Sequence, residues 1–126
     1  MPVRSLSSSV LRWPKRSEVD AALRLFAVRE ARRRPDLILL GYFGSYARDD
    51  AGVGSDLDIV AVLQSEDRPF ERRAVSWDTS ALPVPADLLI YTFEEWQSLL
   101  QRGGQFAATM QTETVWVYAR NSEPSA

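Results

Sequence analysis

The sequence contains no cysteine and no histidine among its 126 residues. Without cysteine there can be no disulfide, no thiolate nucleophile and no cysteine-bound zinc or iron–sulfur site. Without histidine there can be no Ser–His–Asp triad and no imidazole base or metal ligand. Any catalysis by this chain must therefore use carboxylates, hydroxyl groups, arginine, tyrosine, its single lysine Lys15 or a bound hard metal ion.

Long apolar runs and a large excess of one charge are also missing. No apolar run approaches the ~20 residues of a membrane-spanning helix, and residues 1–10 lack the apolar core of a signal peptide. We therefore expect a cytoplasmic protein that does not enter a membrane. The 15 basic and 17 acidic residues leave a net charge of −2, so we expect no strong binding to nucleic acid. The length and the 45% hydrophobic content are typical of one soluble globular domain.

We interpret residues 1–16 as an N-terminal arm that Val10, Leu11 and Trp13 attach to the body, residues 17–120 as one domain and residues 121–126 as a disordered tail. Helical spacing predicts a first helix from Ser17 to Arg34, with Ser17 and Asp20 close to a capping box at its start. Its apolar face is formed by Val19, Ala22, Leu23, Phe26 and Ala27. We interpret the arginines at 32–34 as a solvated helix end, with a phosphate- or partner-binding patch as the alternative.

The remaining elements alternate between strands and helices. Apolar segments predict strands at 37–43, 56–63, 84–92 and 115–119, and short helices are expected at 45–50, 70–77 and 105–112. A further helix at 93–102 has an apolar face of Phe93, Trp96, Leu99 and Leu100, and Gly103 ends it. This order predicts an α/β (α+β) fold, with a small mixed sheet backed by helices. We assign the four tryptophans to packing.

Paired carboxylates begin the strand at 56–63. Asp56 and Asp58 are two residues apart, so their side chains share one face of the strand while Leu57 and Ile59 face the opposite layer. Their Cα atoms then lie roughly 6–7 Å apart, a separation at which two carboxylates can hold one or two hard cations. Asp87 lies in an otherwise apolar strand, where an Asp is rarely buried without a partner or metal. If the two strands are neighbours, the three aspartates form an oxygen-only site that suits magnesium or manganese.

Gly44 and Ser45 follow a buried strand and open an expected helix. Glycine permits close approach of the backbone, and a helix N-terminus presents free N–H groups and a positive dipole end. Arg48, one turn later, can reach the same anion with its planar guanidinium group. The segment therefore predicts a phosphate-binding turn, separated by a ten-residue gap from the carboxylates.

At these residues the sequence resembles the minimal nucleotidyltransferases of the DNA polymerase beta-like superfamily. Their pattern is Gly-Ser-x-Ala-Arg-Gly-x-Ala-x-x-x-Ser-Asp-x-Asp-Leu, and their third acid usually falls on a later strand, as Asp87 does. Asp49 replaces the usual glycine and Ile59 replaces leucine. The positions that match are Gly44, Ser45, Ala47, Arg48, Ala51, Ser55, Asp56 and Asp58.

The resemblance implies the polymerase beta-like nucleotidyltransferase fold and transfer of a nucleoside monophosphate from a nucleoside triphosphate to a hydroxyl acceptor, with release of pyrophosphate. It implies that two Mg2+ ions, or Mn2+, are held by the catalytic residues Asp56, Asp58 and Asp87. It also implies that Gly44, Ser45, Arg48 and Ser55 bind the nucleotide phosphates. The acceptor can be a protein side chain. The alternative is a weakly catalytic or non-catalytic binding module, such as the antitoxin of a toxin–antitoxin pair whose partner is a helical HEPN protein.

Three other interpretations stay open at this stage. Asp-x-Asp also occurs in haloacid-dehalogenase-like phosphatases and in glycosyltransferases, but there the acids follow an apolar strand, whereas here they precede one. Singly, each of the three aspartates could also cap a strand or accept bonds from backbone amides.

Asp49 and Asp50 either face solvent or weaken triphosphate binding. Tyr46 is the candidate for stacking on a nucleotide base.

Overall fold

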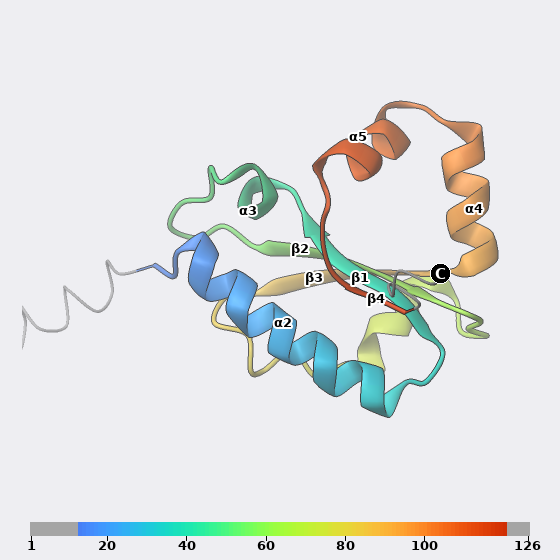
Figure 1. Cartoon of the computed structure of the whole chain (residues 1–126), viewed down its shortest axis with the longest axis horizontal. Coiled ribbons are helices and arrows are strands. Elements are labelled where there is room, and N and C mark those ends of the chain that lie inside the picture. Colours follow the sequence, from blue (N-terminus) through green and yellow to red (C-terminus); the bar gives the residue numbers. More distant parts are fainter. Residues whose placement is uncertain (1–12, 121–126) are drawn as a thin grey trace, which may run out of the picture.

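Four strands and five helical segments lie within residues 13–120, the part of the chain that this computed structural model describes (Figure 1). The predicted contacts of Val10 and Leu11 and the predicted disordered tail lie outside these residues. With the labels of Figure 1, the elements are α2 (Arg16–Arg33), β1 (Leu37–Phe43), α3 (Ser45–Arg48), β2 (Leu57–Leu63), the 3-10 helix η1 (Phe70–Ser76), β3 (Ala86–Thr92), α4 (Phe93–Arg102), α5 (Gln105–Glu113) and β4 (Val115–Ala119).

The strands form one mixed sheet in the order β3-β2-β1-β4. β1 is antiparallel to both β2 and β4, whereas β2 and β3 are parallel. The mixed sheet backed by helices that the sequence predicted is therefore confirmed. The parallel pairing matters most for function, because it aligns the starts of β2 and β3, where the predicted aspartates lie.

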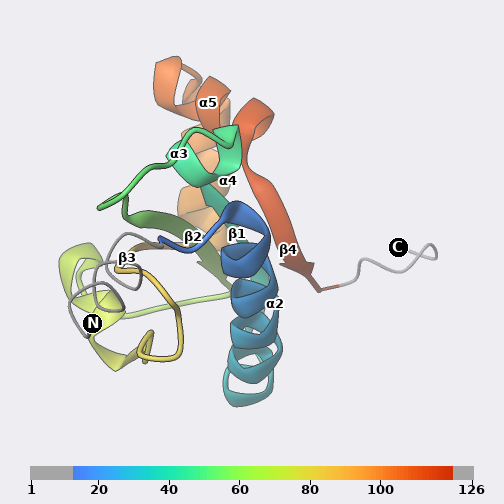
Figure 2. The same ribbon diagram turned by 90° about the vertical axis from the view of Figure 1, so that its left-hand side faces the viewer.

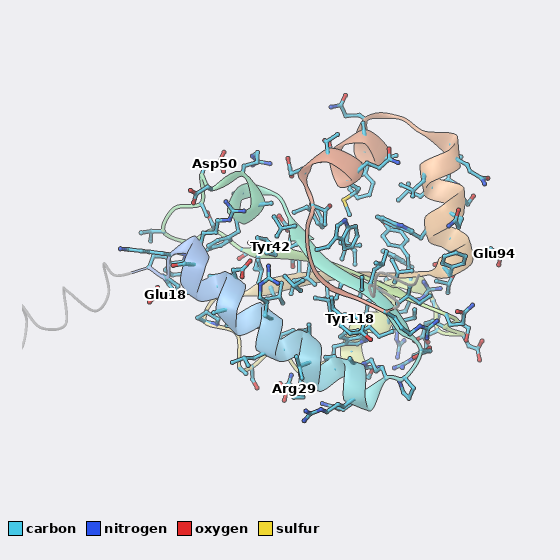
Figure 3. All side chains as sticks on the ribbon, in the orientation of Figure 1. Glu18, Arg29, Tyr42, Asp50, Glu94 and Tyr118 are labelled. Atoms are coloured by element: carbon cyan, nitrogen blue, oxygen red, sulfur yellow. The ribbon has the colours of Figure 1, made fainter. Side chains whose placement is uncertain are left out.

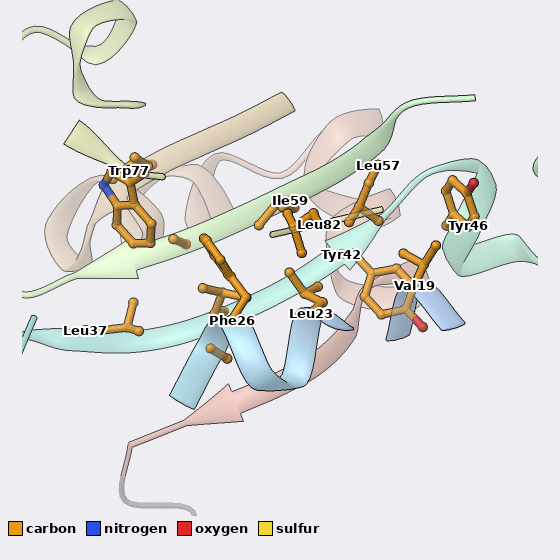
Figure 4. Packing of buried hydrophobic residues seen from close by; sticks show 14 of the residues in the cluster. Val19, Leu23, Phe26, Leu37, Tyr42, Tyr46, Leu57, Ile59, Trp77 and Leu82 are labelled. Atoms are coloured by element: carbon orange, nitrogen blue, oxygen red, sulfur yellow. The ribbon is translucent and has the colours of Figure 1, made fainter. Parts of the chain in front are cut away.

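Each face of the sheet has its own apolar core. On one face, Leu23 and Phe26 of α2 pack against Leu57 and Ile59 of β2 (Figure 4). On the other face, Val60 and Val62 pack with Trp96 of α4 and Met110 of α5. The alternation along β2 thus confirms the predicted opposition of Leu57 and Ile59 to the aspartate face. It follows that Asp58 lies on the side of α4 and α5.

The start of α2 differs from the predicted capping box. The helix begins at Arg16, and Lys15 is its N-cap residue. The Lys15 N–H donates to the Glu18 carboxylate at 2.9 Å, so Glu18 takes the role expected of Asp20. Asp20 instead accepts hydrogen bonds from Arg24 and from the Tyr42 hydroxyl.

The end of α2 carries a buried ion-pair cluster. The prediction of a solvated helix end was therefore wrong for Arg34. Glu30 is fully buried, and Arg34 Nε donates to its carboxylate at 2.9 Å. The Arg34 guanidinium also lies 4.0 Å from the centre of the Trp77 ring. A carboxylate can be buried here because paired cations and hydrogen bonds offset its desolvation.

The tryptophans pack as predicted. Trp77 and Trp96 are buried, Trp116 meets Trp96 edge-on at 5.8 Å, and Trp13 donates its indole N–H to the Tyr46 hydroxyl at 2.7 Å. The predicted apolar face of α4 is only partly right, because Phe93 is 41% exposed. No helix within residues 13–120 is long and apolar enough to cross a bilayer.

An ion pair holds α4 against the chain that precedes it. Arg73, which is buried, donates to the Glu95 carboxylate at 2.6 Å and to the Ile90 carbonyl at 3.0 Å. Glu95 also completes a capping box with Thr92, the N-cap residue of α4. Mainly because of the Arg73 hydrogen bond, the pKa of Glu95 falls to about 2.

Glu95→Gln is expected to destabilise the fold by about 1 kcal/mol at pH 7, a figure reduced for the solvent screening of this partly exposed carboxylate. Because the folded pKa of Glu95 lies below its ordinary value of 4.5, the stabilisation is fully present above pH 4.5 and is lost as the pH falls toward 2. Urea denaturation at a series of pH values measures this. Glu94→Gln, an exposed neighbour, is the control. A difference between wild type and Glu95→Gln that stayed constant down to pH 2 would contradict the assignment.

Candidate functional site

An open cleft of about 510 Å³ lies where α3, α5 and the first residues of β2 and β3 come together. Figure 2 shows α3 and α5 at the same end of the molecule. All seven site residues predicted from the sequence line this cleft, including Ser55 in the loop before β2. Its lining consists of Phe43, Gly44, Ser45, Arg48, Ser55, Asp56, Asp58, Asp87, Phe106, Thr109 and Glu113.

The strand register brings the aspartates together. Asp58 of β2 is paired with Asp87 of β3 in the parallel ladder and with Phe43 of β1 in the antiparallel one. Asp56 lies two residues before Asp58, directly before β2, and lines the same cleft. One expectation was wrong: Asp87 is exposed, because β3 is an edge strand and Asp87 is its second residue. Desolvation therefore does not force a partner on Asp87, and its place in the cleft is what relates it to the other two acids.

Asp58 carries its negative charge in an unfavourable environment. It is half-buried, and burial raises its pKa, with further increases from the negative charges of Asp87 and Asp56. The positive charge of Arg48 acts in the opposite direction but does not reverse the shift. The negative charges of Asp56 and Asp87 thus repel that of Asp58, and a cation bound among the three would relieve that repulsion.

The chemistry of these donors fits a hard divalent cation. All three side chains are carboxylates, which magnesium and manganese prefer. Within residues 13–120, however, no three acidic side chains already converge into a metal-binding group. The residues therefore supply oxygen ligands and negative charge suited to such a cation, and binding one would require the three carboxylates to draw closer together.

Gly44 connects the carboxylates to the turn that follows β1. Its φ of 78° and ψ of −154° lie in a region that essentially only glycine occupies. A Cβ atom built at this position would collide with Oδ2 of Asp58. Glycine is therefore required here twice, once for the backbone conformation and once to leave room for the Asp58 carboxylate.

α3 is a single turn, Ser45–Arg48, which is shorter than the helix predicted at 45–50. The expected helix dipole is therefore weak, and individual groups must bind an anion at this turn. Asp49 follows in the left-handed conformation, with φ 62°. This explains why the related pattern has glycine there, and Asp is among the few other residues that tolerate this conformation.

Asp49 and Asp50 both lie outside the cleft, as in the first of the two alternatives considered from the sequence. Both side chains are exposed and neither belongs to the cleft lining. Asp50, labelled in Figure 3, accepts a hydrogen bond from Arg48 Nε at 3.2 Å. Asp49 lines a separate hollow with Arg16 and Asp20 of α2.

The turn already binds a carboxylate of the protein itself. The backbone N–H of Gly44 donates to Glu113 Oε2 at 2.7 Å. Arg48 Nη1 lies 3.4 Å from each oxygen of the same carboxylate. The two groups expected to bind phosphate thus converge on one anion, which shows that the turn can bind one.

Two predicted ligands have other contacts. Tyr46 is 1% exposed and its hydroxyl accepts from Trp13, so the prediction that it stacks on a base is wrong. Ser55 lines the cleft, and its hydroxyl oxygen also accepts from the Gly52 N–H at 2.9 Å. That bond closes the loop before β2. The aromatic side chains that do line the cleft are Phe43 and Phe106, which meet edge-on at 6.2 Å.

Sequence reasoning missed every cleft residue contributed by α5. These are Phe106, Thr109 and Glu113. One signal could have found Glu113, namely the pairing of β1 with β4. Tyr42 is paired with Val115, and continuing this antiparallel register by two residues places Glu113 opposite Gly44.

The sequence matches one known protein family, and the structure is similar to solved structures. Residues 27–106 match the family model described as a nucleotidyltransferase domain. The structure is similar to that of a candidate nucleotidyltransferase from Sulfolobus solfataricus, with TM-score 0.62 and 18% identity over 85% of this chain and 86% of that one. It is also similar to a mutant MntA–HpeT toxin–antitoxin, with TM-score 0.51 and 18% identity over 78% of this chain and 74% of that one. No curated protein matches the sequence.

Proposed function

Because the chain belongs to the nucleotidyltransferase domain family, we propose that it transfers a nucleoside monophosphate from a nucleoside triphosphate to a hydroxyl group and releases pyrophosphate. Family membership and the polymerase beta-like fold agree with the sequence-based prediction. One observation carries the proposal to this chain. The Gly44–Ser45 turn and all three aspartates line the same cleft, although they come from three separate segments of the sequence.

The turn is the proposed site for the outer phosphates of the triphosphate. The Gly44 N–H and the Arg48 guanidinium donate to phosphate oxygens there, and the Ser45 hydroxyl, which lines the cleft, can add a third donor. The support is that Gly44 and Arg48 both contact the Glu113 carboxylate. Donors fixed around the position of the leaving pyrophosphate stabilise the charge that develops on it.

Asp56, Asp58 and Asp87 are the proposed ligands of Mg2+, with Mn2+ as the alternative cation. When bound, the cation supplies charge neutralisation and lowers the pKa of a coordinated hydroxyl. Asp87 lines the cleft and is exposed, so an acceptor can reach it, and its carboxylate can receive the proton of the attacking hydroxyl. Ser55, whose hydroxyl already holds the loop before Asp56, fixes the position of that ligand.

The proposed acceptor is a side-chain hydroxyl of a partner protein. The cleft is an open one, and the described residues, 13–120, include no second unit that could enclose a small acceptor. The similarity to a toxin–antitoxin structure suggests a toxin partner, of the helical HEPN type expected from the sequence. A second candidate function rests on the same likeness: this chain would neutralise the toxin by binding it, with little catalysis.

With Mg2+, a triphosphate labelled at the α-phosphorus and a HEPN-type protein from the same genome, the chain is expected to transfer label to that partner. A triphosphate labelled at the γ-phosphorus should transfer none, because the γ-phosphate leaves in pyrophosphate. Gel autoradiography and mass spectrometry of the partner measure the outcome.

Chelation of the divalent cation is the first control and should abolish the label. Absence of transfer from either nucleotide, combined with tight association of the two proteins, would replace the enzymatic proposal with the binding-module one. Transfer of the γ-label would instead indicate a kinase and contradict both.

A further inference from the structure

Glu113 is the one acidic residue of the cleft that the proposed chemistry does not use. It ends α5, and its side chain is only 17% exposed. It accepts a hydrogen bond from the Gly44 N–H and lies against Arg48. These are the same two donors to which the proposed function assigns the outer phosphates.

The position of Glu113 is unfavourable for its own helix. A negative charge at a helix C-terminus faces the negative end of the helix dipole, and the last turn of α5 contains no basic residue that could compensate. Its carboxylate also adds to the negative charge around Asp58 and contributes to the raised pKa there. The contacts that stabilise Glu113 in the cleft are therefore those with Gly44 and Arg48, which lie outside its own helix.

A carboxylate and a phosphate oxygen use the same recognition, namely backbone N–H groups and a guanidinium group. We propose that Glu113 is an internal occupant of the phosphate-binding turn, which an incoming polyphosphate must displace. This inference rests on the proposed function and adds to it a residue that sets the affinity for the substrate. The contact keeps Gly44 and Arg48 facing the cleft, and it makes phosphate binding weaker than those donors alone would allow.

The fold fixes the backbone of Glu113 beside the turn and leaves the contact to its side chain. Glu113 is the last residue of α5, directly before Thr114 and the strand β4 that pairs with β1. Its backbone is therefore anchored beside Gly44, while its side chain is long enough to reach the turn. Shortening the side chain by one methylene should release the turn without changing the net charge of the protein.

The test measures binding of magnesium tripolyphosphate, which has no nucleoside, by isothermal titration calorimetry with the full chain. Glu113→Gln is expected to bind about tenfold more tightly than wild type, because an amide competes less well than a carboxylate for Arg48. Glu113→Asp is expected to bind several-fold more tightly at unchanged net charge. Glu94→Gln, on α4 and away from α3 (Figure 3), removes the same charge as Glu113→Gln and should stay within about twofold of wild type.

Three results would overturn the inference in distinguishable ways. If both Glu113 variants bind as wild type does, Glu113 does not compete, while the phosphate-binding turn of the proposed function stands. If they bind more weakly, Glu113 supports Arg48 as a positioning residue. If no variant, including wild type, binds tripolyphosphate, the turn is not a phosphate site and the proposed function fails with the inference. Thermal unfolding of each variant checks that it is folded.

Discussion

Asp58→Asn is expected to lower nucleotidyl transfer by roughly 10^3-fold while leaving the protein at least as stable as wild type. Asp58 is close enough to both other acids of the proposed metal site for their charges to act on it; it is paired with Asp87 in the sheet and is two residues from Asp56. Electrostatic stabilisation by a bound cation is worth several kcal/mol, and each 1.36 kcal/mol corresponds to a tenfold change in rate. Asparagine keeps the shape of the side chain and removes the charge that binds the cation.

The stability outcome separates this loss from misfolding. Burial and the charges of Asp87 and Asp56 raise the pKa of Asp58, so the ionised side chain is under repulsion in the folded protein. Removing that charge should raise the free energy of unfolding or leave it unchanged, as is common where a site is strained for function. Urea denaturation without metal measures stability, and transfer of α-label measures activity. A destabilised variant, or one that retains activity, would contradict the role given to Asp58.

Gly44→Ala is expected to destabilise the fold by about 1–3 kcal/mol, because φ 78° and ψ −154° are essentially restricted to glycine. It should also reduce transfer by roughly 100-fold, since misplacing a catalytic group by about 1 Å can have that effect. The added Cβ would meet the Asp58 carboxylate, so either the turn or the aspartate must move.

Two other glycines of the same region separate these causes. Gly54 also has a positive φ, 88°, but a Cβ there would meet nothing within 4 Å. Gly54→Ala should therefore lose stability with little loss of activity. Gly52 has open space and no positive φ, so Gly52→Ala should change neither. If Gly54→Ala lost as much activity as Gly44→Ala, backbone strain alone would explain the effect and the contact with Asp58 would not matter.

The local features of the site could be predicted from the sequence because they depend on short-range patterns. Two-residue spacing placed Asp56 and Asp58 on one face, and the length of the apolar segments indicated the strands. The glycine that the related pattern has at the position of Asp49 also has a local explanation, because the backbone there is left-handed. The site of three aspartates was predicted only if the strands of Asp58 and Asp87 were neighbours. The parallel pairing of β2 with β3 meets this condition and brings Asp87 into the cleft.

The missed features depend on contacts between distant segments. Tyr46 was expected in the cleft because it neighbours Ser45, but the single turn of α3 directs it into the core, where its hydroxyl accepts from the partly buried Trp13. Asp87 was expected to be buried because its neighbours are apolar, yet the edge position of β3 exposes it. Glu113 could be placed only once β4 was known to pair with β1. Sequence periodicity gives the face of a strand, but not its neighbours in the sheet.

The charge of the cleft also affects the kinetics of encounter. Its lining contains one cation, Arg48, and four carboxylates, so the field at its mouth opposes the approach of a free triphosphate. Like charges slow diffusional association, and screening or neutralisation speeds it. For the proposed substrate, the species that binds fastest is then the nucleotide already complexed with its cation. The association rate therefore depends on the fraction of nucleotide in that complex.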